Sequence, residues 1–254
     1  MKVVILAGGF GSRLSEYTKL VPKPMVQISK KPILIHIMKH FANYNFKNFY
    51  IATGYKKTII NKYFTTISSS KKKLGSKHLL FKNFKSDEYQ DWEVNLIDTG
   101  LNSMTGGRLK QIEKYINKDQ AFFMTYGDGL SNVNLSDLLS FHLKHGRIGT
   151  VTAVHPPARF GELKISSYSK VLSFKEKPQT TSSWINGGYF IFDKKFFTYI
   201  NSNSTILEEK PLEKLSKKNN LMAYKHIGFW QPMDTKRDKD YLEKLYKKNK
   251  KKWP

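Results

Sequence analysis

A loop with three glycines and one arginine follows the first apolar run of the chain. The run VVIL at 3–6 leads into AGGFGSR, which contains Gly8, Gly9 and Gly11 and ends at Arg13. Glycines leave backbone N–H groups uncovered, so such a loop can surround phosphate oxygens. A guanidinium matches two phosphate oxygens better than an ammonium does. The segment predicts an anion site, although a bare glycine loop can also be only a tight turn.

Two better-known phosphate-binding loops do not fit this segment. The P-loop pattern G-x-x-x-x-G-K-[ST] is absent, because no Gly-Lys-Ser/Thr follows Gly8 at that spacing. The dinucleotide pattern G-x-G-x-x-G fails as well, because Gly9-x-Gly11 is followed by Arg13 and Leu14 and not by a further glycine. The loop therefore belongs to neither class.

A lysine held between two prolines comes next. Pro22 and Pro24 restrict the backbone on both sides of Lys23, twelve residues after Gly11. A lysine in a rigid turn can be aimed at a phosphate, whereas a solvated surface lysine is the ordinary alternative. The constrained setting beside the glycine loop favours a functional role for Lys23.

A repeated strand-then-helix order must position these residues. It favours an α/β fold: a Rossmann-like, doubly wound, mostly parallel mixed sheet with a small antiparallel C-terminal portion. The glycine loop then lies at the carboxyl end of the first strand, where open α/β sheets bind ligands. The expected strands are 2–6, 47–53, 93–97, 121–125 and 149–154, and the expected helices are 32–45, 58–64, 105–116 and 135–144, the last capped by Asn134.

Two segments depart from this order. Residues 65–92 are rich in serine and lysine, which indicates a variable insertion or lid carrying a strand or two. After residue 155, short turns separate the expected strands, which are partly antiparallel. These strands are GELKIS, KVLSFKEK, INGGYFIF and 222–226, with helices at 211–219 and 238–250.

Composition limits the partners. The chain has 254 residues and a formal net charge of +24, and 39 of its 44 basic residues are lysine. Lysine spread over the whole chain indicates a biased composition more than a dedicated nucleic-acid surface, although the charge attracts anions. We therefore expect no specific nucleic-acid partner.

The chain contains no cysteine, which excludes disulfides, thiolate metal sites and a cysteine nucleophile. The N-terminal apolar run is too short for a signal peptide, and no apolar stretch approaches the ~18 residues of a membrane span. We expect a cytoplasmic location and no membrane partner.

Further motifs occur downstream of the glycine loop. GDG stands at 127–129, FKEKP at 174–178 and Asn-Gly-Gly at 186–188. Together with GGFGSRL and PKPM they resemble the sugar-phosphate nucleotidyltransferases, and the resemblance spans nearly the whole chain. SMTGGRLK at 103–110, FMTYGDG at 123–129 and GFWQPMDT at 228–235 look like the branch that uses CTP and glucose 1-phosphate.

The resemblance implies one domain over 1–254 and an in-line attack of the sugar phosphate on the α-phosphate of CTP. Residues 1–150 would bind the nucleotide, and 151–254 would bind the sugar and end in a helix. Such a reaction requires positioning and charge neutralisation more than covalent chemistry. Family members are commonly oligomers, so a homo-oligomer is implied as well.

The resemblance also assigns roles around the phosphates. The backbone of Leu6, Ala7, Gly8, Gly9, Gly11, Ser12 and Gly127 would bind the nucleotide. Arg13 would neutralise the β- and γ-phosphates, and Lys23 would bridge the two reacting phosphates. Asp128 and Asp234 would hold Mg²⁺ as cofactor. The ordinary alternatives are a turn aspartate for Asp128 and a helix cap for Asp234.

The resemblance assigns a further group of residues to the base. Ser103, Met104, Thr105, Gly106 and Arg108 would read the base, with a helix start and a solvated arginine as the alternative.

On the sugar side, Lys177 would hold the phosphate of glucose 1-phosphate. Glu176, Asn186 and Gly187 would contact the sugar, and Trp184, Tyr189 and Trp230 are candidate walls. Cytosine comes from the resemblance and not from spacing, so UTP or dTTP stays open, as does a non-catalytic nucleotide-binding module.

Overall fold

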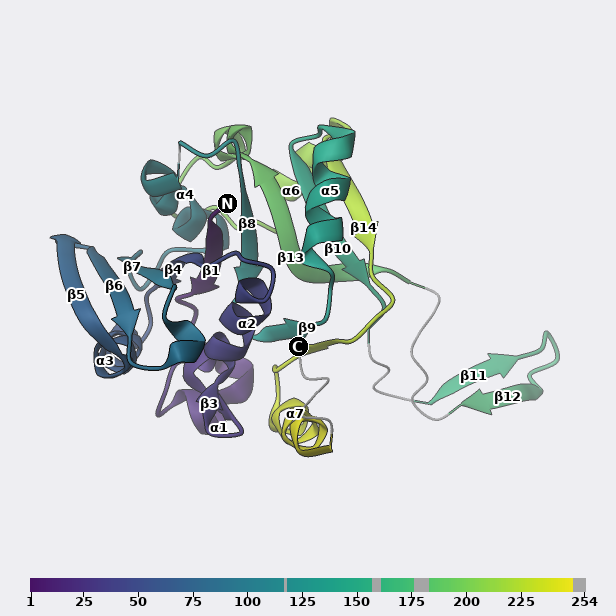
Figure 1. The fold of residues 1–254 in the computed structure, drawn as a ribbon. Coiled ribbons are helices and arrows are strands. Elements are labelled where there is room, and N and C mark those ends of the chain that lie inside the picture. The colour runs from purple at the N-terminus through teal and green to yellow at the C-terminus, as the bar shows by residue number, and fades with distance from the viewer. Residues whose placement is uncertain (117, 157–160, 176–182, 249–254) are drawn as a thin grey trace.

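One mixed nine-stranded sheet organises the described part of the chain (Figure 1). The computed structural model describes residues 1–116, 118–156, 161–175 and 183–248. The strand order is β14-β10-β13-β8-β1-β4-β7-β6-β5. These strands are β1 Val3–Ala7, β4 Asn48–Thr53, β5 Ser68–Gly75, β6 His78–Phe84, β7 Glu93–Asp98, β8 Ala121–Tyr126, β10 Gly149–Val154, β13 Ile185–Asp193 and β14 Leu221–Lys225.

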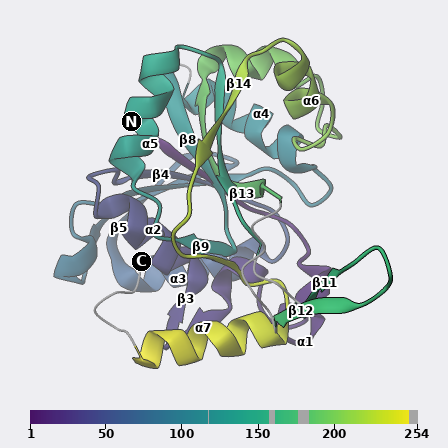
Figure 2. The same cartoon turned by 90° about the vertical axis from the view of Figure 1, so that its right-hand side faces the viewer.

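Helices cover both faces of this sheet (Figure 2). β1 is buried on both sides: Val3 and Ile5 pack into one core, and Val4 and Leu6 pack into the other. A strand that is apolar at every position requires such cover on both faces. The helices are α1 Ser15–Thr18, α2 Ile33–Ala42, α3 Lys57–Ile67, α4 Thr105–Ile116, α5 Leu135–His145, α6 Lys210–Lys217 and α7 Lys236–Lys248.

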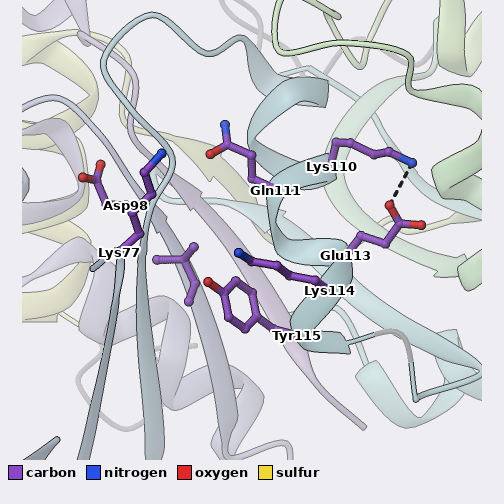
Figure 3. Close-up of a pocket in the computed structure, with 8 residues that line it drawn as sticks. Lys77, Asp98, Lys110, Gln111, Glu113, Lys114 and Tyr115 are labelled. Atoms are coloured by element: carbon purple, nitrogen blue, oxygen red, sulfur yellow. Dashed lines mark ion pairs between the residues drawn. The ribbon is translucent and has the colours of Figure 1, made fainter. Parts of the chain in front are cut away.

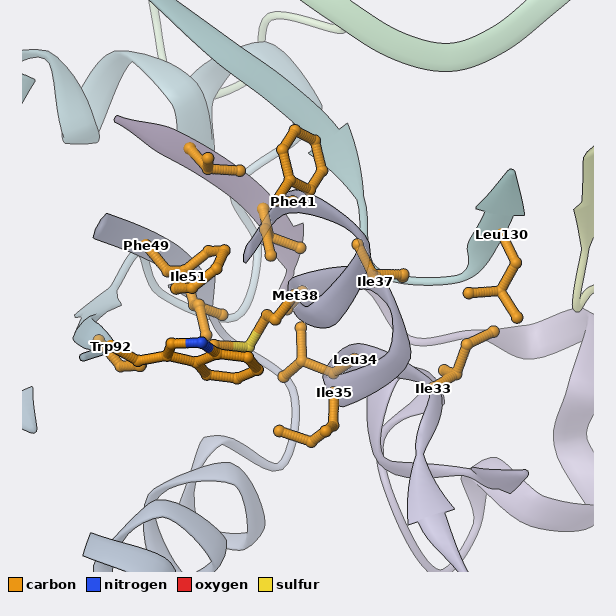
Figure 4. Packing of buried hydrophobic residues seen from close by; sticks show 14 of the residues in the cluster. Ile33, Leu34, Ile35, Ile37, Met38, Phe41, Phe49, Ile51, Trp92 and Leu130 are labelled. Atoms are coloured by element: carbon orange, nitrogen blue, oxygen red, sulfur yellow. The ribbon is translucent and has the colours of Figure 1, made fainter. Parts of the chain in front are cut away.

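The larger core forms around α2 (Figure 4). Apolar residues recur along this helix so that nearly its whole surface is buried, beginning directly after Pro32. Its side chains meet aromatic and aliphatic residues of the neighbouring strands, and the cluster includes Leu34, Ile37, Met38, Phe41, Phe49, Ile51 and Trp92. This packing fixes the central parallel strands, from whose ends the functional loops start.

The expected α/β class is confirmed, and the described residues also form three small two-stranded sheets beside the main one. These pair β2 Gln27–Ile28 with β3 Lys31–Pro32, β9 Gly129–Ser131 with β15 Trp230–Pro232, and β11 Glu162–Ile165 with β12 Val171–Lys175. Asn134 caps α5 as expected, because its side chain accepts hydrogen bonds from the backbone of Ser136 and Asp137.

The structure places the two segments that depart from the strand-then-helix order. The antiparallel C-terminal strand β13 lies inside the main sheet, antiparallel to both β8 and β10. Residues 65–92 complete α3 and then form β5 and β6, which extend the sheet at its edge. The buried side chains of Phe81 and Phe84 hold this hairpin against the core, and the hairpin carries the strands expected in this segment.

No helix within the described ranges is long and apolar enough to cross a membrane.

Candidate active site

A cavity of about 680 Å³ opens at the carboxyl ends of β1 and β8. The first strand ends at Ala7, and β8 ends at Tyr126, immediately before the GDG turn. Because parallel neighbouring strands end at the same edge, the glycine loop and this turn face each other. The cavity also receives residues from the start of α4, from β13 and from the segment around β15, which are far apart in the chain.

The glycine loop is tightly fitted. Gly11 has a φ of 65°, a left-handed backbone conformation that residues other than glycine rarely adopt. It precedes the short 3-10 turn Ser12–Leu14. A Cβ on Gly8 would lie 2.2 Å from Nη1 of Arg108. The Gly8 carbonyl accepts a hydrogen bond from the backbone N–H of Tyr55 (3.0 Å). The loop is therefore held in place from behind, with its front open to the cavity.

Lys23 connects the two aspartates singled out in the sequence. Its Nζ lies 2.6 Å from Oδ2 of Asp128 and 2.5 Å from Oδ1 of Asp234. Arg13 donates to the other oxygen of Asp234 at 2.9 Å. Burial alone lowers the pKa of Lys23, but the two carboxylates outweigh it and raise the pKa above its ordinary value. Lys23 is thus a charged, buried side chain, while the Arg13 side chain is 73% exposed.

The fold brings Asp234 to this cluster from 211 residues away. Strand β15 pairs with β9, and the Met233 N–H donates to the Asp128 carbonyl at 2.8 Å. Thr235 caps the following helix, because its Oγ1 accepts from the Asp238 N–H (3.3 Å), and Asp238 accepts in return from the backbone of Asp234 and Thr235 (3.1 and 2.8 Å). The helix-cap alternative for Asp234 is therefore wrong, because Thr235 caps the helix and the Asp234 carboxylate faces Lys23.

Arg108 is buried behind the glycine loop. Its Nη1 donates to Thr99 Oγ1 and to the Gly100 carbonyl, both at 2.7 Å, and its Nη2 donates to the Leu101 carbonyl at 3.0 Å. Burial lowers the pKa of Arg108, although Asp98 acts in the opposite direction. The solvated alternative is wrong, and the side chain holds the loop that follows β7.

The comparisons with known proteins agree with this arrangement. The model of the family described as "Nucleotidyl transferase" matches residues 2–250. The chain belongs to the nucleotidyl transferase family. It is 44% identical over 262 residues to the glucose-1-phosphate cytidylyltransferase of Salmonella typhi, covering 100% of this chain and 98% of that protein. It is 35% identical to the probable glucose-1-phosphate cytidylyltransferase of Bacillus subtilis, with 100% and 99% covered.

Solved structures share the fold of this nucleotidyl transferase. HddC from Yersinia pseudotuberculosis superposes with a TM-score of 0.70 at 24% identity, covering 96% of this chain and 99% of that chain. A UDP-glucose pyrophosphorylase complexed with UDP-glucose gives 0.71 at 17% identity, covering 98% of each. At these identities the likeness establishes the fold alone.

The carboxylates fit the Mg²⁺ expected of a nucleotidyl transferase. No group of three or more His, Cys, Asp or Glu side chains gathers anywhere in the described ranges. Mg²⁺ commonly uses only one or two protein carboxylates and takes its other oxygens from phosphates and water. Asp128 and Asp234, which already share one cation, are such a pair.

Nearly all the residues expected to bind the nucleotide line the cavity. They are Leu6, Ala7, Gly8, Gly9, Gly11, Ser12, Arg13, Lys23, Ser103, Met104, Thr105, Arg108 and Gly127. Gly106 does not, because it is buried against Thr205, where a Cβ would lie 2.8 Å from the Thr205 carbonyl oxygen. No residue of 65–92 lines the cavity.

The opposite end of the cavity is formed by β13 and β15. Asn186, Gly187, Tyr189 and Trp230 all line it. The Trp230 indole donates to the Gly187 carbonyl at 2.6 Å. Trp184 instead packs on His155, with ring centroids 3.9 Å apart, and is not among the lining residues. Glu176 and Lys177 lie outside the described residues.

Sequence reasoning missed Tyr126 and Glu208. The Tyr126 hydroxyl donates to Glu208, which also accepts from Thr105 Oγ1 at 2.6 Å. Burial, followed by Glu208, raises the pKa of Tyr126. Tyr126 directly precedes the GDG motif, which is a signal that could have found it. Glu208 stands in a segment without any motif, and only the packing of 203–208 on α4 brings it here.

Proposed function

We propose that this chain transfers CMP from CTP to α-D-glucose 1-phosphate and releases CDP-glucose and pyrophosphate. The full-length similarity to proteins named glucose-1-phosphate cytidylyltransferase carries this proposal. The cavity supports it, since it combines a glycine loop, two basic side chains and two carboxylates. These are the groups that a reaction between two phosphates requires.

In the proposed reaction, an oxygen of the sugar phosphate forms a bond to the α-phosphorus of CTP. The bond from that phosphorus to the bridging oxygen breaks, and pyrophosphate leaves with the bonding electrons. The attacking oxygen is already anionic, so no general base is required. The protein's contribution is to align the two phosphates and neutralise their charge.

The glycine loop and its neighbours would bind the triphosphate. The backbone N–H groups from Gly8 to Ser12 would surround phosphate oxygens, and Arg13 would face the departing pyrophosphate. Asp128 and Asp234 would hold Mg²⁺, which when bound supplies positive charge to the phosphates. Lys23, now shared between these carboxylates, would turn to the reacting phosphates.

The base and the sugar would occupy opposite ends of the cavity. Residues 103–105 line one end, with Arg108 behind them, and we assign this end to the base. Asn186 and Gly187 line the other, which we assign to the sugar together with Lys177 and Glu176. Tyr126 and Glu208 also line the cavity and would offer a hydroxyl and a carboxylate to ligand hydroxyls.

Pyrophosphate release measured with each of four nucleoside triphosphates and several sugar 1-phosphates tests the proposal. We expect turnover with CTP and α-D-glucose 1-phosphate to exceed every other pair at least tenfold. Equal rates with UTP and CTP would refute the choice of base. Absence of release with every pair would favour a non-catalytic nucleotide-binding module.

The Asp128→Asn variant further distinguishes an enzyme from a non-catalytic nucleotide-binding module. If the chain is an enzyme, this change lowers Mg²⁺-dependent turnover strongly, while unchanged turnover would refute the metal role of Asp128.

We also propose that the chain assembles as a homo-oligomer through the β11–β12 hairpin. The hairpin projects away from the main sheet (Figure 1). It exposes apolar side chains over both strands, namely Leu163, Ile165, Val171, Leu172 and Phe174. A two-stranded hairpin is marginally stable alone, and exposed apolar patches commonly mark protein contacts. A second copy of the chain is the partner that would cover them.

A further inference from the structure

We propose that a second pocket, separate from the nucleotide cavity, binds a phosphate monoester and influences nucleotide binding through the loop at 98–103. The pocket has a volume of about 400 Å³ and lies between α4 and the end of β7, beside the β5–β6 turn. It is lined by Lys77, Ile97, Asp98, Lys110, Gln111, Glu113, Lys114 and Tyr115. The proposed binding of the ester does not depend on the proposed function, whereas the influence on CTP binding rests on it.

Two lysines of this pocket make no direct ion pair, although Lys77 lies within electrostatic reach of Asp98, whose pKa it helps Lys57 to lower against the effect of burial. Lys110 pairs with Glu113 at 2.8 Å, and Asp98 pairs with Lys57 at 2.5 Å. No ion pair to Lys77 or Lys114 occurs within the parts of the chain that the structure describes. Figure 3 shows Lys114 extending from α4 toward the side where Lys77 lies, while the Lys110–Glu113 pair occupies another side of the helix.

The pocket offers more than charge. The Tyr115 ring lies beside Lys114, whose Nζ is 5.0 Å from the ring centroid. The His78 ring packs edge-on against Tyr115 at 4.7 Å and so fixes its orientation. Ile97 adds an apolar surface, and Gln111 adds an amide. Two ammonium groups suit a dianionic phosphate, and a ring with an apolar neighbour suits the organic part of an ester.

One loop separates this pocket from the nucleotide cavity. On the pocket side, Asp98 accepts from the Gly100 N–H at 3.0 Å, and Gln111 donates to the Thr99 carbonyl and to Ser103 Oγ, both at 3.0 Å.

On the cavity side, Arg108 binds the carbonyls of Gly100 and Leu101, and residues 101–105 line the cavity. A ligand that draws Lys77 or Gln111 toward itself therefore acts on the loop that we assign to the base.

Calorimetric titration tests the binding. Saturating CDP-glucose first fills the nucleotide cavity, and inorganic phosphate, glucose 6-phosphate and AMP are then titrated separately. The titrations are repeated without CDP-glucose on an Arg13→Ala/Lys23→Ala variant, whose nucleotide cavity lacks its phosphate-binding cations. This second arm keeps the test independent of the proposed function.

We expect one ester molecule to bind per chain, at least tenfold more weakly in a Lys77→Gln/Lys114→Gln variant. The matched control, Lys72→Gln/Lys73→Gln on exposed β5, removes the same charge and should bind like the original protein. Preference for AMP would identify a nucleotide as the source, and preference for glucose 6-phosphate a sugar phosphate.

Three results would overturn the site. These are no saturable binding of any probe, equal affinity in the Lys77/Lys114 variant, or esters bound no more tightly than inorganic phosphate. The influence on the active site has its own readout: the preferred ester should shift the KM for CTP at least threefold in the original protein and the control. An unchanged KM alongside measured binding would overturn only the coupling.

Discussion

At the scale of single residues, Lys23 is the most informative side chain of the nucleotide cavity. Its ammonium is shared between Asp128 and Asp234, and it is nearly inaccessible to water. If Asp128 and Asp234 hold Mg²⁺ as proposed, the cation and this ammonium require the same two carboxylates. Lys23 then competes with Mg²⁺ whenever no phosphate draws it away.

Replacing Lys23 with methionine tests this competition. We expect Lys23→Met to bind Mn²⁺, a probe for Mg²⁺, about tenfold more tightly in the absence of nucleotide, a gain of about 1.4 kcal/mol. Electron paramagnetic resonance of free Mn²⁺ measures the affinity without any turnover. Lys31→Met, which removes an ion pair to Glu88 elsewhere, is the control. Unchanged Mn²⁺ affinity in Lys23→Met would contradict the competition.

Gly8 shows how little room the loop has. A methyl group at Gly8 would meet the Arg108 guanidinium, which is fixed by Thr99, Gly100 and Leu101 and cannot yield freely. We expect Gly8→Ala to raise the KM for CTP at least tenfold. Gly75→Ala is the control, because no atom lies within 4 Å of its added carbon. Equal KM values for the two variants would show that Arg108 adjusts.

At the scale of elements, buried histidines make the packed helices sensitive to acid. Burial lowers the pKa of His40 on α2 and of His142 on α5 to about 4. The unfolded chain therefore binds more protons than the folded one between pH 6.5 and about 4. The stability that neutral histidines contribute is fully present above this window and is lost as the pH falls through it.

His40→Gln isolates one of these contributions. Between pH 7.5 and pH 5, the original protein should lose about 2 kcal/mol more of its free energy of unfolding than the variant does. Urea unfolding at both pH values measures this difference. The reference is the same pair of measurements on Lys39→Gln, a neighbouring residue on α2 that keeps both histidines. Parallel losses in His40→Gln and the original protein would exclude His40 as a source of acid sensitivity.

At the scale of the whole molecule, the β11–β12 hairpin is the part that the main cores do not stabilise. None of its residues belongs to either buried cluster, and Phe174 is 62% exposed. If the chain forms the proposed homo-oligomer, Leu172→Asp/Phe174→Asp should convert it into monomers, as measured by light scattering. Lys170→Asp changes charge on the same hairpin and should leave the assembly intact. A monomeric original protein would refute the oligomer.

The sequence by itself determined the class of fold and much of the chemistry. The strand into GGFGSR, the helix at 105–116 and the Asn134 cap were predictable, because each depends on neighbouring residues. The glycine loop and Lys23 were also singled out from the sequence, since glycines and flanking prolines constrain the backbone locally, and both line one cavity. Motif order then supported a family that the full-length comparison confirms.

Only the tertiary structure decided which residues meet. Asp234 reaches Lys23 through the pairing of β15 with β9, and β13 lies within the sheet between β8 and β10. Glu208 joins Tyr126, and Arg108 turns to the loop carbonyls, for the same reason. Such contacts depend on how the two cores pack on the two faces of one sheet. Local sequence patterns reflect only neighbouring residues, so they do not predict which distant residues this packing brings together.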